Sequence, residues 1–504
     1  MSALSMLAMG FKQCMDPQIL LLCLFGAVIG TMVGVLPGFG PAACLAVLLP
    51  VVYGRDPLSS LVLLAGIFSG AMFGGMITSI NLNIPGENAS IVTTFDGHPL
   101  AKKGKAGVAM GVAAISSFVG GTIGVVLLSL LGQPLANIAL AFGPSEYLSI
   151  YLFTFIAVVT IGGKSFVASS ISLIFGLLMS VVGLDVISGS PRLTFGSVNL
   201  MAGIDFLPAV IGLFGLSEVV ISLLEGERVT ITKEQIKKFK LKEVFPSIKQ
   251  LIHCIPTWLR SSPIGFSVGS LPGAGATIAT FLSYGMEKRL AKDPETFGKG
   301  NIRGVAAAEA TNNGSAMGSY VPLLALGIPG SATTAVLLGA FVLVGITPGP
   351  LLFREHPDLV WGLIASMYLG NVALLLINTA FIPLFLWLLR ISEKTMPVIV
   401  ATLCFIGTFS NQNLVSDILI MLLFTFIGVF FKKLDIPPAP CIIALVLGGD
   451  LEFSLRQTLE LFQGNFLLCF TKPITTMFFV VGALLILNVM IKSIKSRKAN
   501  ANTM

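Results

Sequence analysis

The sequence predicts an all-α integral membrane protein: a polytopic helical bundle with two inverted repeats, broken helices and re-entrant hairpins. The composition predicts a membrane protein. Of the 504 residues, 55% are hydrophobic and only 11% are charged, whereas a soluble domain carries about 25% charged residues. The mean hydropathy is +0.92. So few charges cannot coat the apolar surface of a water-soluble core. We therefore expect the apolar surface of the folded chain to face lipid.

Long apolar segments fill both halves of the chain, whose length accommodates about ten to twelve spans of ~20 residues. In the first half they cover residues 17–36, 41–53, 58–82, 106–132, 146–162, 166–187 and 206–224. In the second half they cover residues 258–271, 274–286, 304–327, 332–346, 359–389, 396–410, 414–431, 439–450 and 472–491. Four of them are too short to cross roughly 30 Å of hydrocarbon, and we expect half-helices, re-entrant arms or protein-buried pieces there. These four are 41–53, 258–271, 274–286 and 439–450.

Basic residues predict which loops are cytoplasmic. Lysine and arginine gather within residues 102–105, 228–260, 288–303 and 492–498, and short loops rich in these residues stay on the cytoplasmic side. A nucleic-acid interface is disfavoured, because no aromatic-interleaved basic fold surrounds these clusters. The predicted organisation is a first membrane repeat, a basic cytoplasmic connector, a second inverted membrane repeat and a cytoplasmic tail. Their bounds are 15–224, 225–257, 258–491 and 492–504.

Two motifs recur in the same order and indicate an internal repeat. Leu36-Pro37-Gly38-Phe39-Gly40 returns at residues 271–275 with an offset of 235. Residues 70–86 align with 314–330 at an offset of 244, and both stretches end in Ile-Pro-Gly. Either motif alone is a chance match in a chain with 54 glycines, but their order and spacing together favour a repeat.

The charges of the connecting loops predict that the two copies face opposite ways. The loop after the first motif holds a single basic residue in copy one, Arg55, and five in copy two, at 288–303. The loop after Ile-Pro-Gly reverses this, with three basic residues at 102–105 but only Arg354 at 347–358. Inverted repeats are a common plan of secondary transporters. We expect residues 17–54 and 258–287 to form hairpins entered from opposite faces, with the N-terminus outside.

Proline and glycine interrupt the apolar segments at matched places in the two copies. Proline removes a backbone donor and glycine permits the turn, so such breaks persist in a membrane only against protein or a wet cavity. A helix that restarts after the break presents free N–H groups and a partial charge of roughly +0.5, which suits an anion. No lysine or arginine lies mid-segment there, so dipoles, amides and hydroxyls would hold a carboxylate. The predicted substrate-binding residues are Pro37, Gly38, Gly40, Asn81, Asn83, Pro85, Gly86, Pro272, Gly273, Gly275, Asn312, Asn313, Pro329 and Gly330.

The alternative interpretation of these breaks is structural. Pairs of glycines at GxxxG spacing are plentiful, for example Gly30 with Gly34 and Gly66 with Gly70, and such pairs commonly mark close helix packing. The prolines and glycines would then be kinks and packing positions without a ligand. Four breaks arranged as two matched pairs favour the functional interpretation.

Two carboxylates within apolar sequence, Glu87 and Glu309, are candidates for binding a coupling ion. An ionisable group at membrane depth is a functional hypothesis by default, and each residue would bind Na⁺ or carry a proton. Their alternative is a hydrogen-bonded carboxylate at a helix end. We expect no catalytic residues, no metal site and no cofactor beyond the coupling Na⁺ or H⁺. The G-x-S-x-G match at 265–269 has no acid and histidine partners, and the chain has no P-loop.

These motifs resemble the large membrane subunit of the tripartite tricarboxylate transporter family, the TctA-type proteins. The resemblance covers roughly residues 15–430, and its motifs are residues 34–41, residues 70–86, Asp96-Gly97-His98-Pro99 with 102–104, residues 309–313 and residues 326–330. It implies a multi-pass permease of the bacterial inner membrane that works with a small four-helix membrane subunit. A periplasmic solute-binding protein would deliver citrate or a related carboxylate. Glu87-Asn88 stands where many relatives have smaller neutral residues, which bears on the substrate rather than on the class.

The expected function is therefore that of a permease subunit that imports tri- or dicarboxylates by cation-coupled alternating access. The alternative is a channel-like or scaffold membrane subunit whose specificity lies in its partners. A channel would conduct without saturation, whereas a carrier saturates. An intramembrane enzyme is a further alternative, for which the sequence offers no paired catalytic residues. Nucleic acid is not an expected partner.

Overall fold

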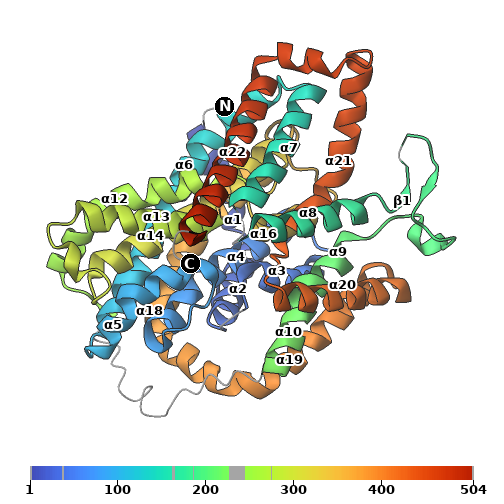
Figure 1. Ribbon diagram of the computed structural model, residues 1–504. Coiled ribbons are helices and arrows are strands. Elements are labelled where there is room, and N and C mark those ends of the chain that lie inside the picture. Colours follow the sequence, from blue (N-terminus) through green and yellow to red (C-terminus); the bar gives the residue numbers. More distant parts are fainter. Residues whose placement is uncertain are drawn as a thin grey trace.

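The computed structural model describes residues 3–36, 39–161, 165–185, 187–225, 244–273 and 275–501, and they form a bundle of helices (Figure 1). The described chain is almost entirely helical; its two strands, β1 (Gly183–Leu184) and β2 (Pro191–Arg192), are two residues each and pair antiparallel. Within it, eight helices are long and apolar enough to cross a membrane. They begin and end at Pro17–Gly34, Pro57–Leu82, Ala106–Ala139, Pro144–Ile161, Phe206–Leu224, Pro357–Ala380, Val415–Lys433 and Pro473–Ile491. The prediction of a polytopic all-α membrane protein is confirmed.

The first half of the chain contains a short N-terminal helix, a helical hairpin and a series of longer helices. Its main elements are α1 (Ala3–Cys14), α2 (Pro17–Gly34), α3 (Pro41–Leu48), η1 (Leu49–Val52), α4 (Pro57–Leu82), η2 (Asn88–Ser90), α5 (Ile91–Lys102), α6 (Ala106–Ala139), α7 (Pro144–Ile161), α8 (Phe166–Ser180), η3 (Val198–Leu200), α9 (Phe206–Val210), the π-helical η4 (Ile211–Leu216) and α10 (Ser217–Glu225). Aspartate and proline set two of the starts: Asp16 caps α2 and Asp56 caps α4, each followed by proline at the first helical position, where its missing N–H costs nothing.

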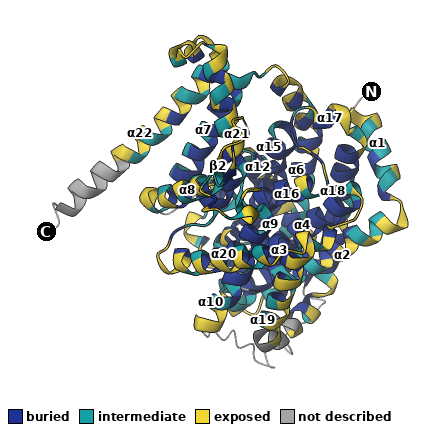
Figure 2. Ribbon diagram, turned by 90° about the vertical axis from the view of Figure 1, so that its right-hand side faces the viewer, coloured by how far each residue is buried: buried dark blue, intermediate teal, exposed yellow. Residues whose placement is uncertain are grey.

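The second half also begins with a helical hairpin, and it ends in four long helices. Its elements are α12 (Ile248–Gly269), α13 (Gly275–Leu290), η6 (Pro294–Thr296), α14 (Ile302–Gly318), α15 (Tyr320–Leu326), α16 (Ala332–Leu343), α17 (Leu352–Glu355), α18 (Pro357–Ala380), α19 (Ile382–Gln412), α20 (Val415–Lys433), α21 (Ala439–Leu461), η7 (Phe466–Thr471) and α22 (Pro473–Ala501). Figure 2 shows α4 and α16 inside the buried centre of the bundle, whereas the described part of α22 carries mainly exposed and intermediate residues. All 18 residues of the most apolar window in α4 are buried.

Three predicted segments differ from the observed helices. The apolar segments expected at 258–271 and 439–450 belong to longer helices, α12 and α21, of 22 and 23 residues. Neither helix is among the eight candidate spans, and the expectation of half-helices, re-entrant arms or protein-buried pieces stays a prediction. In both cases polar residues mark the limit of the apolar run, but the helix extends through them. The apolar stretch at 359–389 is divided at Phe381, and α19 then continues through Pro397. Helices α1 and α5 were not predicted. The predicted domain bounds stay predictions, although the last ten residues of the expected connector are helical.

The two copies of the predicted repeat share a close helix–helix contact. In copy one, α2 packs on α4 so closely that a Cβ atom on Gly30 would lie 2.2 Å from the carbonyl oxygen of Ile67. In copy two, α12 packs on α14, and a Cβ atom on Gly265 would lie 2.3 Å from the carbonyl oxygen of Thr311. These positions correspond at the two sequence offsets. Small residues let helix backbones approach closely in membranes, so each copy contains the same tight helix pair.

Contacts between the copies are reciprocal. Helix α3 of the first hairpin packs on α16, which follows the second Ile-Pro-Gly, and α13 of the second hairpin packs on η2, which follows the first. Likewise α2 contacts α18, and α12 contacts α6. In each of these two sets, an element of one copy contacts an element of the other copy, and the corresponding two elements are in contact as well. Such reciprocal contacts are typical of two-fold symmetry. The opposite orientation of the copies across the membrane stays a prediction.

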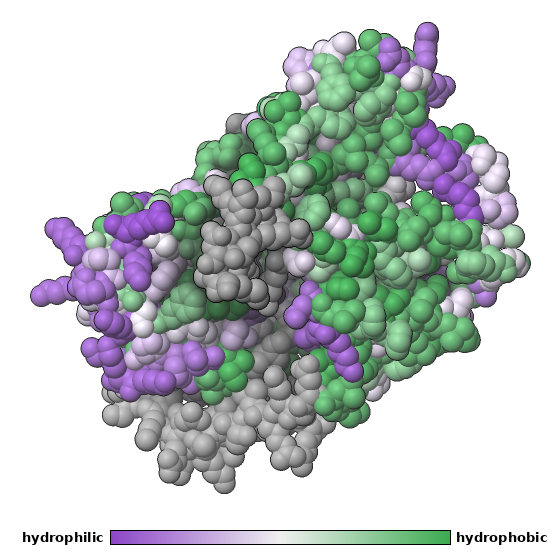
Figure 3. All heavy atoms as spheres, viewed as in Figure 1, coloured by the Kyte–Doolittle hydropathy of each residue, from purple (hydrophilic) through white to green (hydrophobic). Residues whose placement is uncertain are grey.

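The outer surface of the bundle is largely apolar. In the view of Figure 3, hydrophobic side chains cover most of the described surface, and hydrophilic ones gather mainly at the end formed by α12, α13 and α14. Phe426, Leu467 and Leu484 are among the large hydrophobic side chains that are more than half exposed. Burial of such side chains is normal in a soluble protein, so this surface fits a lipid environment.

Candidate functional site

Both broken helices stop in the same way. Helix α4 ends at Leu82 and is followed by Asn83 in the left-handed region, with φ of 60°. Helix α15 ends at Leu326 and is followed by Gly327, with φ of 71°. Asparagine and glycine are the residues that adopt this conformation most readily. The proline of Ile-Pro-Gly then prevents either helix from continuing.

Both chains also restart in the same way after Ile-Pro-Gly. The backbone N–H of Glu87 donates to Ser90 Oγ at 3.2 Å, and the backbone N–H of Ser331 donates to Thr334 Oγ1 at 2.8 Å. Each pair forms one half of a capping box at the start of a helical turn. The breaks are therefore built alike, but copy one has a carboxylate where copy two has a hydroxyl.

The second hairpin tip meets the second break. The backbone N–H of Gly273 donates to the carbonyl oxygen of Gly330 at 3.0 Å, which places Pro272 and Gly273 beside Pro329. Gly273 has φ of 79°, and a Cβ atom there would lie 2.5 Å from Val158 Cα. Its prediction as a turn position that needs glycine is borne out by this geometry; its role toward a substrate stays a prediction.

The first hairpin tip is only partly described. Pro37 and Gly38 lie outside the described residues. Gly40 caps the start of α3, and a Cβ atom on it would meet nothing within 4 Å. Gly86 packs against the end of α2, since its Cβ would lie 2.5 Å from the carbonyl oxygen of Gly34. Gly275 starts α13 with φ of 63° and likewise has open space around it.

Among the described residues, neither Asn81 nor Asn83 forms a hydrogen bond with the other two predicted asparagines, Asn312 and Asn313. The Asn81 amide donates to the carbonyl oxygen of Ile77 at 2.7 Å and lies 3.2 Å from the sulfur of Met110. Asn83 is exposed and serves as the left-handed cap. The structure thus gives Asn83 a conformational reason to be asparagine.

Glu309 lies in the middle of α14 and is fully buried. Thr93 of α5 donates to its Oε1 at 2.6 Å, and Ser117 of α6 donates to its Oε2 at 2.8 Å. These hydrogen bonds fix the carboxylate at the junction of three helices, with one donor from each neighbour. Thr93 and Ser117 were missed by sequence reasoning, because hydroxyls in apolar helices commonly bond to their own backbone instead.

Glu87 reaches α14 from the first break. The amide nitrogen of Asn312 donates to Glu87 Oε1 at 2.6 Å, so a residue of copy one and a residue of copy two are in direct contact. The adjacent Asn313 donates to the backbone oxygen of Glu309 at 3.2 Å. Asn312 Oδ1 and Asn313 Oδ1 are both buried and have no hydrogen-bond partner among the described residues. The two candidate carboxylates and the two candidate asparagines therefore lie on or against one helix.

A second buried glutamate nearby has a different environment. Glu287 of α13 accepts from Arg260 at 2.6 Å, from Arg303 at 2.7 Å and from Thr257 at 2.9 Å. Its side chain is fully buried. Within the described ranges, none of the ion pairs involves Glu87 or Glu309. Glu287 is thus charge-compensated, whereas the two candidate carboxylates are not.

Asp96 of the Asp96-Gly97-His98-Pro99 motif fixes the loop that leads into α14. Asp96 is fully buried, and its Oδ1 accepts from the backbone N–H groups of Gly298, Gly300 and Asn301 at 2.7 to 2.9 Å. Its Oδ2 accepts from the hydroxyl of Tyr284 at 2.8 Å. A carboxylate that accepts this many hydrogen bonds is strongly held. Asp96 of copy one therefore positions the start of the copy-two helix that carries Glu309.

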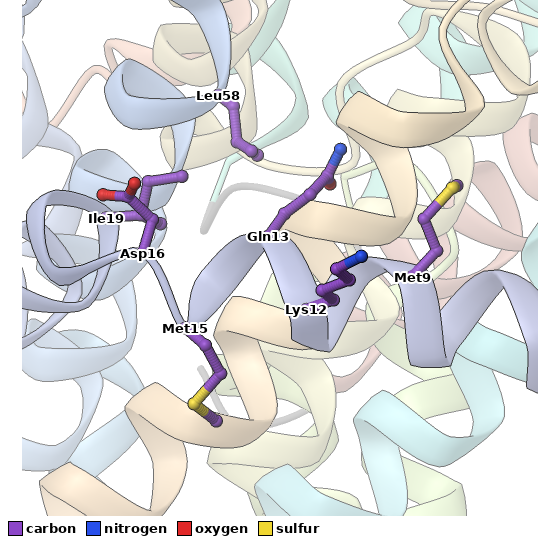
Figure 4. Close-up of a pocket in the computed structure, with 7 residues that line it drawn as sticks. All are labelled: Met9, Lys12, Gln13, Met15, Asp16, Ile19 and Leu58. Carbon is purple, nitrogen blue, oxygen red and sulfur yellow. The ribbon is translucent and has the colours of Figure 1, made fainter.

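A surface pocket lies away from these residues. It has a volume of about 710 Å³ and lies where α1 meets α2 (Figure 4). Its lining residues are Met9, Lys12, Gln13, Met15, Asp16, Ile19 and Leu58. None of them belongs to the predicted site, and the buried junction at α14 remains the candidate.

Comparisons with known proteins point to one family. The model of the tripartite tricarboxylate transporter TctA family matches residues 20–443. An uncharacterized 52.8 kDa protein in the TAR-I ttuC' 3' region of Agrobacterium vitis is 36% identical over 499 residues, or 99% of this chain and 98% of the relative. An uncharacterized protein in the TAR-II ttuC' 3' region of the same organism is 36% identical over 234 residues, or 46% of this chain and 97% of the relative. No solved structure matches the chain. Because the family model spans most of its length, the chain belongs to the tripartite tricarboxylate transporter TctA family.

Proposed function

We propose that this chain is the permease subunit that imports tri- or dicarboxylates such as citrate by cation-coupled alternating access. Membership of the TctA family makes it a component of a tripartite transporter that works with a binding protein. The proposed site of action is the bacterial inner membrane. The proposed partners are a periplasmic solute-binding protein and a small four-helix membrane subunit.

The observation that carries this proposal is the contact of the first break with the second copy. Glu87 follows Ile-Pro-Gly of copy one and bonds to Asn312 of copy two at 2.6 Å. Secondary transporters bind substrate and coupling ion between repeats, at discontinuous helices. A site assembled from both copies changes when the copies move relative to each other, which is the requirement of alternating access.

The chemistry of the breaks suits a carboxylate that must also be released. Restarting helices present backbone N–H groups and a partial positive charge, and the hydroxyls of Ser331 and Thr334 lie at the second break. A permanent arginine or lysine partner would hold a polyanion strongly. Neutral dipoles together with a co-transported cation would hold it reversibly. In this proposal Glu87 and Glu309 take the cation, which is Na⁺ or H⁺.

Uptake by reconstituted protein tests the proposal. Proteoliposomes that contain this chain and its small membrane subunit should accumulate labelled citrate only with the solute-binding protein and an imposed Na⁺ or H⁺ gradient. Uptake should saturate with substrate. Accumulation without either requirement would reject coupled transport, and a non-saturating flux would favour a channel instead.

A further inference from the structure

The junction of the two copies contains negative charge without a positive partner. The carboxylate of Glu309 accepts hydrogen bonds from the hydroxyls of Thr93 and Ser117, and the carboxylate of Glu87 accepts one from the amide of Asn312. In the described part of the chain, neither carboxylate forms an ion pair. Like charges so placed repel each other, and a buried charge without a partner is strongly unfavourable.

The amide of Asn312 has a defined orientation. An ionised carboxylate only accepts hydrogen bonds, so the amide nitrogen of Asn312 must face Glu87. The other atom of this amide group is the oxygen Oδ1. Asn312 is only 1% exposed, and no described residue donates a hydrogen bond to Oδ1. An unsatisfied buried acceptor costs about 1–3 kcal/mol. Beside Glu87 there is thus an oxygen that needs a donor or a cation.

We propose that a sodium ion binds between the Glu87 carboxylate and the Asn312 amide oxygen, with the Glu309 carboxylate one helical turn away. This inference rests on the proposed function and names the ion and its ligands. Glu309 and Asn312 are three residues apart on α14 and so lie on one face of the helix. Hard cations prefer carboxylate and carbonyl oxygens.

The ligand set favours a monovalent ion. Among the described residues no group of three or more acidic, histidine or cysteine side chains gathers, whereas divalent sites commonly collect several carboxylates. The two proposed ligands, the Glu87 carboxylate and the neutral Asn312 amide, together carry one negative charge, which a single monovalent cation balances. Divalent ions are therefore competitors to be tested and not the inferred ligand.

The site would join the two copies. Glu87 belongs to the break of copy one, and Asn312 belongs to α14 of copy two. A bound cation neutralises the repulsion between the carboxylates and holds the break against α14, and its loss frees the break to move. This inference moves Asn312 from the substrate to the cation and leaves Asn313 with the predicted substrate contacts.

Ion binding to the purified full-length chain in detergent tests the inference without substrate or binding protein. Thermal unfolding is followed in NaCl, KCl and choline chloride at equal ionic strength, together with binding of radioactive ²²Na⁺. We expect Na⁺ alone to raise the melting temperature in a saturable way, because a ligand that binds only the folded state stabilises it. In Glu309→Gln the apparent affinity for Na⁺ should fall by roughly 10–100-fold.

Two asparagine variants form the matched comparison. Asn312→Leu should abolish the Na⁺ response. Asn312→Asp, which keeps an oxygen at the Oδ1 position and replaces the Nδ2 donor by a second oxygen, should retain it. Asn378→Leu should respond like the unchanged chain, because Asn378 is also fully buried with an unpartnered oxygen but bonds to Thr31 and to the Leu374 backbone rather than to a carboxylate.

Identical melting in the three salts would overturn the inference, as would equal losses in Asn312→Leu and Asn378→Leu or a stronger response to Ca²⁺. The outcomes also separate the two proposals. Uptake driven by a proton gradient with no Na⁺ response would reject the sodium site alone. A specific Na⁺ response with no gradient-driven uptake would reject the transport mechanism and leave the site in place.

Discussion

Two fully buried glutamates, Glu287 and Glu309, lie on neighbouring helices of the same copy and differ in what surrounds them. Glu287 is held by two arginines and a threonine, and Glu309 by a threonine and a serine. The first is a complete ion-pair cluster that ties α12, α13 and α14 together. The second has hydrogen bonds but no countercharge. Burial alone therefore does not distinguish the two glutamates; the missing countercharge is what makes Glu309 the candidate.

The largest effect on stability is expected where the ion-pair cluster is broken. Glu287→Gln leaves Arg260 and Arg303 without their partner. We expect a loss of about 2–3 kcal/mol in the free energy of unfolding, below the roughly 3–5 kcal/mol typical of fully buried pairs, because the Arg260 side chain is 37% exposed. Thermal unfolding in detergent measures the loss.

Glu309→Gln is the matched control for that prediction. Glutamine keeps an oxygen for Thr93 and removes an uncompensated charge, so the melting temperature in Na⁺-free choline chloride should not fall. Transport should fall by roughly 10–100-fold, the range for loss of a metal-site partner. If both variants lose stability equally, the distinction between the two glutamates is wrong.

A smaller loss is expected at Asp96, which positions α14 without touching Glu309. Asp96→Asn keeps one accepting oxygen for the backbone N–H groups of Gly298, Gly300 and Asn301, but it removes the charge that strengthens these bonds. We expect a loss of about 1–2 kcal/mol in the free energy of unfolding. Hydrogen exchange should show faster opening at 298–301 while the Na⁺ response persists. Unchanged exchange there would contradict the positioning role.

Much of this architecture follows from the sequence. The offsets of 235 and 244 predicted which residues correspond, and the tight pairs of α2 with α4 and α12 with α14 occur at those offsets. The residue types of the breaks were predictable too, because proline and glycine leave few backbone choices. The two carboxylates were identified from their apolar surroundings, which a hydropathy count detects directly.

The rest depends on tertiary contacts that a single sequence does not encode locally. Thr93 and Ser117 are ordinary hydroxyl residues until folding places them against Glu309. The extension of α21 beyond residue 450 was missed because its polar residues are stabilised from elsewhere: Glu452 bonds to Arg192 at 2.8 Å, across 260 positions. Asp96 likewise finds its donors about 200 residues away.

The smallest predicted effect concerns a second ion-pair cluster, next to the β1–β2 hairpin, in which a buried Asp185 meets the partly exposed Arg192 and Arg456. A hydrogen bond from Arg456 holds the pKa of Asp185 below its ordinary value, with further bonds from the backbone N–H groups of Ser188 and Ile187. A lowered pKa stabilises the folded state above the ordinary value of about 3.9. This stability is lost as the pH falls through the lowered pKa.

Cleavage of residues 183–203 by pepsin checks this prediction across acidic pH. The hairpin should become more accessible only below about pH 4, and Arg456→Met should remove the protection at every pH tested. A pH-independent cleavage rate in the unchanged chain would show that the pair contributes nothing. Since the Arg456 side chain is 37% exposed, salt should weaken the protection as well.

A site shared between the copies depends most on their opposite orientation across the membrane. Labelling of single cysteines from each side of the membrane tests this orientation directly. All seven native cysteines are buried, so new cysteines at the exposed positions Arg55 and Lys292 should give the main signal with an impermeant thiol reagent. We predict that Arg55→Cys is labelled from the periplasmic side and Lys292→Cys from the cytoplasmic side. Labelling of both positions from one side would contradict the inverted arrangement and remove the basis for a site shared between opposed copies.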